Sequence, residues 1–284
     1  MTRRTTVSAR IVVFALAAGL AVSAEARADE AVPGPVRDFS RQMPGIFSGL
    51  ENVVARERMT QLIFDTTSDR VFRRRVIVSE YQIAHLEEDP EALWEFRFVS
   101  QVDGKAVPGA SQKIEDFLRL RHRDAREERQ RITNLGESVS LPGCYWHNLT
   151  LILRAFEGAN IENFSWRGSG SRWLFEQVRG LGIPQDFFDP NSPRHYPRGS
   201  LVFSGGALSL LDLEWTANGL VTTISLEFTK PQTRDDIPLP KRYVARRRSA
   251  TSLRTEVQTT FEYGNYRRFQ VKSESEIRTP GSRP

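Results

Sequence analysis

The chain has 284 residues, a formal net charge of +5 and one cysteine, Cys144. A single thiol excludes an intramolecular disulfide framework and every metal motif that needs several cysteines. Nucleic-acid binding needs a concentrated basic face with aromatic residues for base stacking. The densest basic runs, at 73–75 and 246–248, lie in strand-like segments with acidic residues nearby. We therefore expect no nucleic-acid partner.

The first 28 residues have the pattern of a secretory signal peptide. Arg3, Arg4 and Arg10 precede an apolar run at 11–22, and small residues after it place the expected cleavage site near Ala28. The run is shorter than the ~20 apolar residues of a transmembrane helix. Without this segment, which carries four arginines and one glutamate, the net charge is +2. We expect a periplasmic or secreted protein whose membrane contact is peripheral or transient.

Residues 29–57 form the expected N-terminal helical segment. Apolar residues at helical spacing predict a helix over 36–43. Pro44 and Gly45 follow, and we expect a break there because a proline inside a helix removes a hydrogen bond and clashes with the preceding turn. The residues after the break are expected to be helical or irregular, and the pattern becomes strand-like by 57–63.

Two strands with alternating side chains come next, at 70–86 and 93–102, both rich in β-branched and aromatic residues. Asp103-Gly104 then predicts a type I′ hairpin turn, because glycine accepts the positive φ that this turn requires. In the second strand we expect the aromatic residues to point inward and the charged residues between them outward, that is, Trp94, Phe96 and Phe98 against Glu95 and Arg97.

The middle of the chain is less regular. Residues 111–135 predict the clearest helix, with a narrow apolar face and an almost entirely charged middle. Residues 145–156 are apolar and strand-like, and short strands are expected around 164–166 and 173–175. Residues 180–199 are rich in glycine and proline and predict a loop.

Residues 200–278 predict a β-meander with glycine-containing turns. The expected strands are 200–204, 207–215, 220–230, 242–248 and 256–277. Alternate residues of the third strand and of the last strand are apolar and should share one face of the sheet. This face carries Leu220, Thr222, Ile224, Leu226, Phe228, Phe261, Tyr263, Phe269 and Val271.

Together these elements predict an α+β fold made mostly of antiparallel β-structure. Two-faced strands in sequential hairpins, with two helices and no alternation of strand and helix, indicate an antiparallel sheet with one buried face. We expect one domain over 29–284, a curled and incomplete β-barrel with helices packed across its concave face.

Three stretches resemble segments that recur in exported bacterial proteins without assigned activity: RFVSQVDGKAV (97–107), RITNLGESVSLPG (131–143) and FEYGNYRRFQVKSESEIR (261–278). Those proteins, and the meander at 199–228, are similar in pattern to periplasmic lipoprotein carriers and outer-membrane lipoprotein-sorting proteins. The resemblance implies an unclosed barrel that holds acyl chains in an apolar cavity under a helical lid. It carries no lid or barrel residue of the carriers over to a numbered position of this chain.

No constellation of residues names a reaction. None of the four histidines lies at metal-binding spacing from a second histidine or a glutamate, and no glycine-rich phosphate loop opens a helix. Asp189 and His195 would form the acid–base pair of a hydrolase, but no nucleophile-elbow motif accompanies them. A proline-rich turn is the simpler interpretation of 186–200. We expect no catalytic residue, metal or cofactor, and a buried, inert Cys144.

The leading hypothesis is a non-enzymatic binding protein for an apolar ligand, an acyl chain or a lipid. The residues expected to line its interior are Trp94, Phe96, Phe98, Ile224, Leu226, Phe228, Phe261 and Tyr263. The same residues are equally consistent with a dry core packed against the helices. The alternative is an envelope interaction module that binds a protein partner through the sheet edge or through the charged helix at 111–135.

Overall fold

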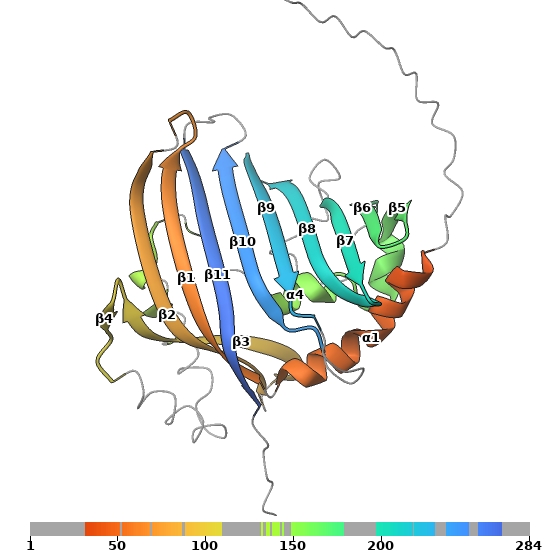
Figure 1. The fold of residues 1–284 in the computed structure, drawn as a ribbon, viewed down its shortest axis with the longest axis horizontal. Helices are drawn as coiled ribbons and strands as arrows, with labels where there is room; N and C mark the ends of the chain where they lie inside the picture. Colours follow the sequence, from red (N-terminus) through yellow and green to blue (C-terminus); the bar gives the residue numbers. More distant parts are fainter. Residues whose placement is uncertain are drawn as a thin grey trace, which may run out of the picture. The chain divides into compact units, whose positions relative to one another are not determined.

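Eleven strands form one antiparallel sheet in the computed structural model (Figure 1). The structure describes residues 32–51, 53–68, 70–86, 89–109, 132, 135–136, 138–142, 144, 149–178, 197–217, 219–230, 237–249 and 255–268. The predicted signal peptide at 1–28, most of the predicted helix at 111–135 and most of the predicted loop at 180–199 lie outside these residues.

The strands follow one another along the chain as β1 Val53–Asp65, β2 Val71–Leu86, β3 Asp89–Val102, β4 Lys105–Ala106, β5 Phe164–Ser169, β6 Arg172–Gln177, β7 Arg198–Ser204, β8 Ala207–Ala217, β9 Leu220–Phe228, β10 Pro240–Ser249 and β11 Thr255–Arg268. Their order in the sheet is β4-β3-β2-β1-β11-β10-β9-β8-β7-β6-β5. The described strands do not close into a barrel, because β4 and β5 are the two edges. The predicted mostly antiparallel, open sheet is confirmed.

The hairpins form where the turn chemistry predicts them. Asp103 and Gly104 have φ values of 49° and 80°, as a type I′ turn between β3 and β4 requires. Gly205 and Gly206, with φ of 61° and 84°, make the equivalent connection between β7 and β8. The alternation in β9 is also confirmed, since every second residue from Thr222 to Phe228 is buried.

Helix α1, Gly34–Glu51, runs through Pro44 without a break, so the predicted interruption is wrong. Pro44 is exposed, whereas the apolar residues of the turns on either side, from Met43 to Leu50, are buried on one face. A proline inside a helix costs about 3 kcal/mol, and burial of two or three apolar side chains offsets that cost. Strand β1 follows at Val53, four residues before the strand-like pattern at 57–63.

The segment at 145–156 is also not the strand that its composition suggested. Its described part contains helix α4, Leu149–Arg154, followed by the 3₁₀ helix η1, Gly158–Asn163. Leu149, Ile152 and Leu153 of this segment are almost fully buried. An apolar run of this length fits a buried helix as well as a strand, and the packing of α4 against the sheet decides in favour of the helix.

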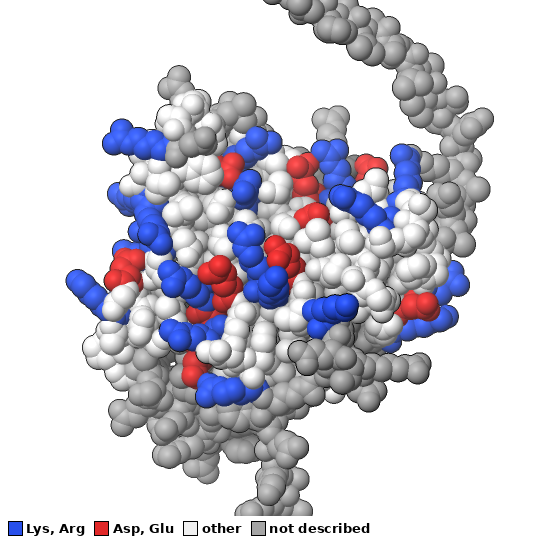
Figure 2. Space-filling model, in the orientation of Figure 1, with Lys and Arg blue, Asp and Glu red and all other residues white. Residues whose placement is uncertain are grey.

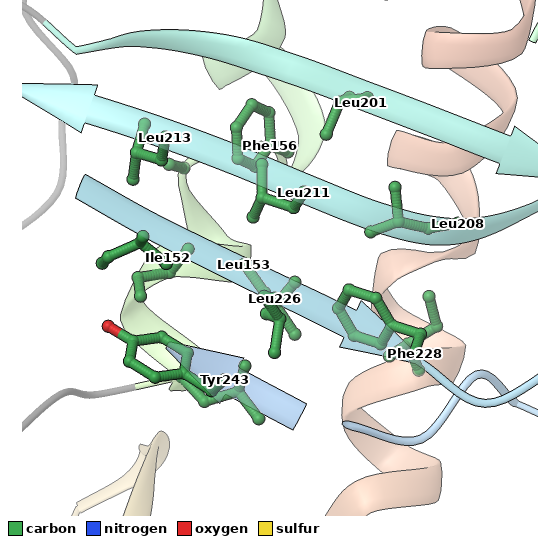
Figure 3. Close-up of a cluster of buried hydrophobic side chains, with 14 of the residues drawn as sticks. Ile152, Leu153, Phe156, Leu201, Leu208, Leu211, Leu213, Leu226, Phe228 and Tyr243 are labelled. Atoms are coloured by element: carbon green, nitrogen blue, oxygen red, sulfur yellow. The ribbon is translucent and has the colours of Figure 1, made fainter. Parts of the chain in front are cut away.

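Helices α1 and α4 cover one face of the sheet, which we call the inner face. Phe39 of α1 packs edge-on against Phe203 of β7, with 5.9 Å between ring centroids. Figure 3 shows the apolar side chains of α4 in the same cluster as Leu211 of β8 and Leu226 of β9. The opposite, outer face carries interspersed arginine and acidic side chains (Figure 2). Within the described residues, no helix has the length and apolar character needed to cross a membrane.

Candidate functional site

Five of the eight predicted lining residues lie on the inner face. Ile224, Leu226 and Phe228 come from β9, and Phe261 and Tyr263 from β11. Each is at most 8% exposed and belongs to the cluster that includes the apolar residues of α1 and α4. The five residues therefore share one continuous apolar layer, which the protein's own helices occupy.

Trp94, Phe96 and Phe98 lie on the other side of the sheet, so their predicted inward orientation is wrong. Arg97 is the residue of β3 that points inward, because its guanidinium lies 5.4 Å from the centroid of the Phe261 ring. Successive residues of a strand point to opposite faces, which places Phe96 and Phe98 outward. Both are nevertheless buried, and their rings stack at 6.4 Å. From Phe96 to Val99, strand β3 is thus buried on both faces.

A charged cluster is buried within the inner face, and we call Glu57, Glu95, Arg97 and Tyr81 the inner charge cluster. Nε of Arg97 donates to both carboxylate oxygens of Glu57 at 3.1 Å. Its Nη2 donates to Oε2 of Glu95 at 3.4 Å, and the Tyr81 hydroxyl donates to the same oxygen at 2.8 Å. The side chains of Arg97, Glu95 and Glu57 are only 8%, 4% and 0% exposed.

The strand register brings this cluster together. Tyr81 of β2 pairs with Arg97 of β3, and Glu57 of β1 pairs with Ser79 of β2. The Ser79 hydroxyl donates to Oε1 of Glu57 at 3.0 Å. Across the gap to α4, the backbone N–H of Thr150 donates to Oε1 of Glu95 at 2.8 Å. The cluster therefore links three strands to the first turn of α4.

Burial determines the protonation behaviour of the cluster. Removal from water raises the pKa of Glu95, and the nearby Arg97 only partly opposes this shift. Burial also works against the charged guanidinium of Arg97, but Glu57 and Glu95 outweigh it and raise the pKa of Arg97. Burial, followed by the charge of Glu95, raises the pKa of Tyr81 well above its ordinary value. Arg97 is therefore always charged, and Glu95 takes up a proton more easily than a solvent-exposed glutamate does.

A polar side chain further along β1 connects the sheet to the segment at 140–141. Gln61 is fully buried, and its Oε1 accepts a hydrogen bond from the backbone N–H of Leu141 at 2.8 Å. Its Nε2 donates to the Ser140 hydroxyl at 3.2 Å. These contacts, like those of Glu95, use the hydrogen-bonding capacity of a buried group to hold a covering segment on the inner face. The geometry indicates that these buried polar groups hold the covering segments against the sheet. No described group among them is an exposed nucleophile.

The remaining predicted groups give no catalytic constellation within the described residues. Asp189 and His195 lie outside them. Cys144 is half-buried, and burial raises its pKa to about 11, which disfavours the thiolate. No group of three or more His, Cys, Asp or Glu side chains in the described ranges is arranged to hold a metal ion.

Comparison with known proteins finds a structural likeness but no match in sequence. No family model matches the sequence. No curated protein matches it either. A solved structure described as a DUF1329 family protein from Desulfovibrio piger ATCC 29098 is similar over 84% of this chain and 94% of its own, at 12% identity and a TM-score of 0.38.

Proposed function

We propose that this chain is an exported, non-enzymatic protein that binds an apolar molecule, an acyl chain or a lipid, against the inner face of its open sheet. The observation that carries the proposal is the way this face is covered. The described sheet does not close on itself, and helices rather than further strands shield its apolar layer from water. A cover made of helices can be displaced without breaking a strand ladder.

Helix α1 is the part of the cover that we expect the ligand to replace. Its buried apolar residues are Val36, Phe39, Met43, Ile46, Phe47 and Leu50. Burial of six such side chains contributes about 9–18 kcal/mol. An acyl chain of about 16 carbons gains about 13 kcal/mol when it is buried, at ~0.8 kcal/mol per methylene. The two quantities are comparable, so an acyl chain can substitute for α1 on the sheet.

Helix α4 is held differently and is expected to stay in place. Its first turn donates to a carboxylate of the inner charge cluster through Thr150. Its contact with α1, in which the Arg154 guanidinium lies 6.0 Å from the centroid of the Phe47 ring, would be lost together with α1. Loss of the Thr150 contact would leave Glu95 with an unpaired buried oxygen, which costs about 1–3 kcal/mol. The displacement of α1 breaks none of the hydrogen bonds described for Glu95, because the hydrogen bond that Glu95 accepts from Thr150 belongs to α4.

The first test is native mass spectrometry of residues 29–284, followed by organic extraction of the same sample. An extractable lipid mass supports the proposal. The second test joins α1 to β7 with a short thiol-reactive cross-linker between cysteines placed at Phe39 and Phe203, in a Cys144→Ser background. We expect the cross-linked protein to exclude a fluorescent fatty acid and the protein that is not cross-linked to bind it, with each single-cysteine variant, treated in the same way, as control. Equal binding in both forms would refute the displacement of α1.

The alternative function is an envelope interaction module with a dry core. The specific observation in its favour is the tight packing of the inner face, where Leu211, Leu226 and Tyr243 are fully buried against the helices. A clean apo mass and no uptake of the fatty-acid probe would favour this alternative. In that case Phe228→Ala should cost ~3–5 kcal/mol of stability as a core cavity. If Phe228 contacts a ligand instead, the variant should lose affinity and little stability.

A further inference from the structure

The outer face contains a cavity of about 810 Å³ that crosses the strands from β5 to β10. This volume lies within the ~300–1,000 Å³ of small-molecule sites. The cavity is on the side of the sheet opposite α1 and α4, because its lining residues alternate along each strand with residues of the buried core. It is therefore independent of the apolar layer to which the proposed function assigns the lipid.

The strand register explains why the outer face is hollowed here. One row of directly paired residues crosses the sheet with short side chains: Ser200 of β7 pairs with Asp212 of β8, which pairs with Ser225 of β9, and Ser225 pairs with Val244 of β10. The row on one side contains Arg198, Glu214, Thr223 and Arg246, and the row on the other side contains Arg172, Val202, Leu210, Glu227 and Arg242. Because most side chains of these two rows are longer than those of the row between them, a groove forms, which we call the outer trough.

One wall of the trough consists of residues that already pair with each other. Arg198 and Glu214 are register partners of β7 and β8, and the Arg198 Nη2 lies 2.7 Å from the Glu214 Oε1. This contact raises the pKa of Arg198, whose side chain is 69% exposed. Arg246 of β10 belongs to the same wall and lies 3.8 Å from Glu256. These pairs give the trough its shape and leave little free charge.

Two other arginines line the β5–β6 end, where the exposed carboxylate of Glu176 is the register partner of Arg198. Arg167 and Arg172 form no ion pair within the part of the chain that the structure describes, and Arg172 reaches only the Ser200 hydroxyl, at 3.4 Å. Guanidinium groups without carboxylate partners are ready to bind a carboxylate or phosphate of a ligand. Leu174 lies between them on the strands and is 50% exposed, so it offers an apolar surface at the same end.

The floor of the trough provides hydrogen-bond acceptors. The Asp212 carboxylate is half-buried, and its side-chain contact in the described residues is a long hydrogen bond from the Ser200 hydroxyl at 3.5 Å. A carboxylate has about four acceptor positions, so Asp212 can accept hydrogen bonds from a ligand. The side chains of Arg172 and Asp212 approach each other across two strands, because the Ser200 hydroxyl contacts both, at 3.4 Å and 3.5 Å. The two charged groups are therefore at most about 7 Å apart, and a matching ligand carries an anionic group and hydroxyl donors within this distance.

We propose that the outer trough binds an acidic saccharide. Its carboxylate or phosphate group contacts Arg167 and Arg172, its hydroxyls donate to Asp212, and the apolar face of one ring packs on Leu174. An apolar ligand would remove water from the half-buried Asp212 carboxylate and leave most of its acceptor positions without a hydrogen bond. A single-stranded nucleic acid would need aromatic side chains for stacking, whereas Phe175, the aromatic residue at this site, is 3% exposed and belongs to the core.

The test is isothermal titration calorimetry of residues 29–284 with tri-galacturonate, a carboxylated trisaccharide, and with trehalose 6-phosphate. We expect at least one of these two probes to bind, and neutral maltotriose to bind at least tenfold more weakly. Comparison of the carboxylated and the phosphorylated probe shows which anionic group the site prefers. Removal of both free arginines, Arg167→Ala with Arg172→Ala, should weaken binding at least tenfold. The matched control, Arg56→Ala with Arg58→Ala, removes two exposed outer-face arginines outside the trough and should change nothing.

The variant Asp212→Asn separates saccharide recognition from simple attraction of anions. If Asp212 accepts hydrogen bonds from ligand hydroxyls, the amide should weaken binding by about three- to tenfold. If the trough merely attracts anions, the loss of one negative charge should strengthen binding. Each of three outcomes would overturn the proposal: tighter binding by Asp212→Asn, unchanged binding by the double arginine variant, or no heat of binding with either acidic probe. None of these outcomes depends on whether a lipid occupies the inner face.

Discussion

The buried ion pair between Arg97 and Glu57 predicts a large loss of stability when one partner is removed. Arg97→Met keeps an apolar stem of similar length but leaves Glu57, which is 0% exposed, with the Ser79 hydroxyl as its remaining described partner. Loss of one member of a buried pair costs about 3–5 kcal/mol, because the other charge stays buried without compensation. The surface pair of Arg198 and Glu214 provides the control, and Arg198→Met should cost no more than ~1 kcal/mol.

The effect should depend on pH in a defined direction. In Arg97→Met, Glu95 loses a neighbouring positive charge, and burial already raises the pKa of Glu95 in the native protein. A carboxyl group whose pKa is higher in the folded state binds protons more tightly when folded. Stability is therefore lost as pH rises through the folded pKa and regained as pH falls. The carboxyl group of Glu95 contributes ~1.4 kcal/mol to this change for every pH unit that separates its folded and unfolded pKa values.

Urea unfolding followed by tryptophan fluorescence at several pH values between about 5 and 8 measures both effects, provided that the m-value is unchanged. The double variant Glu57→Gln with Arg97→Met should lose less stability than the sum of the losses of the two single variants. The reason is that it contains one unpaired buried charge fewer than Arg97→Met. Additive losses, or an Arg97→Met variant that loses less than ~1 kcal/mol at neutral pH, would show that the pair is not buried as described.

Two further predictions concern the thiol and a glycine of β7. Because burial raises the pKa of Cys144 from 9.0 to about 11, iodoacetamide near pH 8 should alkylate it about a hundredfold more slowly in the native protein than in urea; equal rates would contradict this. Gly199→Ala should destabilise the protein by about 1–3 kcal/mol, because its new Cβ would collide with the Asp212 carbonyl oxygen and with Phe175. Gly45→Ala, which has open space around it in α1, should instead stabilise the protein by ~0.5–1 kcal/mol. Equal changes in the urea midpoint of the two variants would refute the distinction.

The sheet was predictable where one face of a strand is polar. In β9 the alternation between Thr222 and Phe228 assigns the inner face directly, and the register then follows from the turn at Gly219. The same rule fails in β3. A period of two separates Phe96 and Phe98 from Arg97, but it does not say which set points inward when both are buried.

The inner charge cluster could not be predicted from the sequence for the same reason, namely that a period of two does not say which face of β3 points inward. A charged residue between aromatic residues is normally solvent-exposed, so the pattern predicts Glu95 and Arg97 on the outer face. Their burial depends on Glu57, which lies about 40 residues away in sequence and is brought into contact only by the pairing of three strands. No local pattern contains this information. The outer trough likewise depends on residues of six strands that become neighbours only through the register.

The pairing of β1 with β11 has a consequence for how the molecule reaches its native state. The first and last strands that the structure describes meet in the interior of the sheet, where Met59 pairs with Phe261. Every other described strand pair joins neighbours in the chain. Closing a loop of roughly 200 residues makes this contact slow to form compared with the hairpins. Until β11 has been synthesised, β1 and β10 each lack a neighbour on one side. The last described strand then covers both of these exposed strand edges at once.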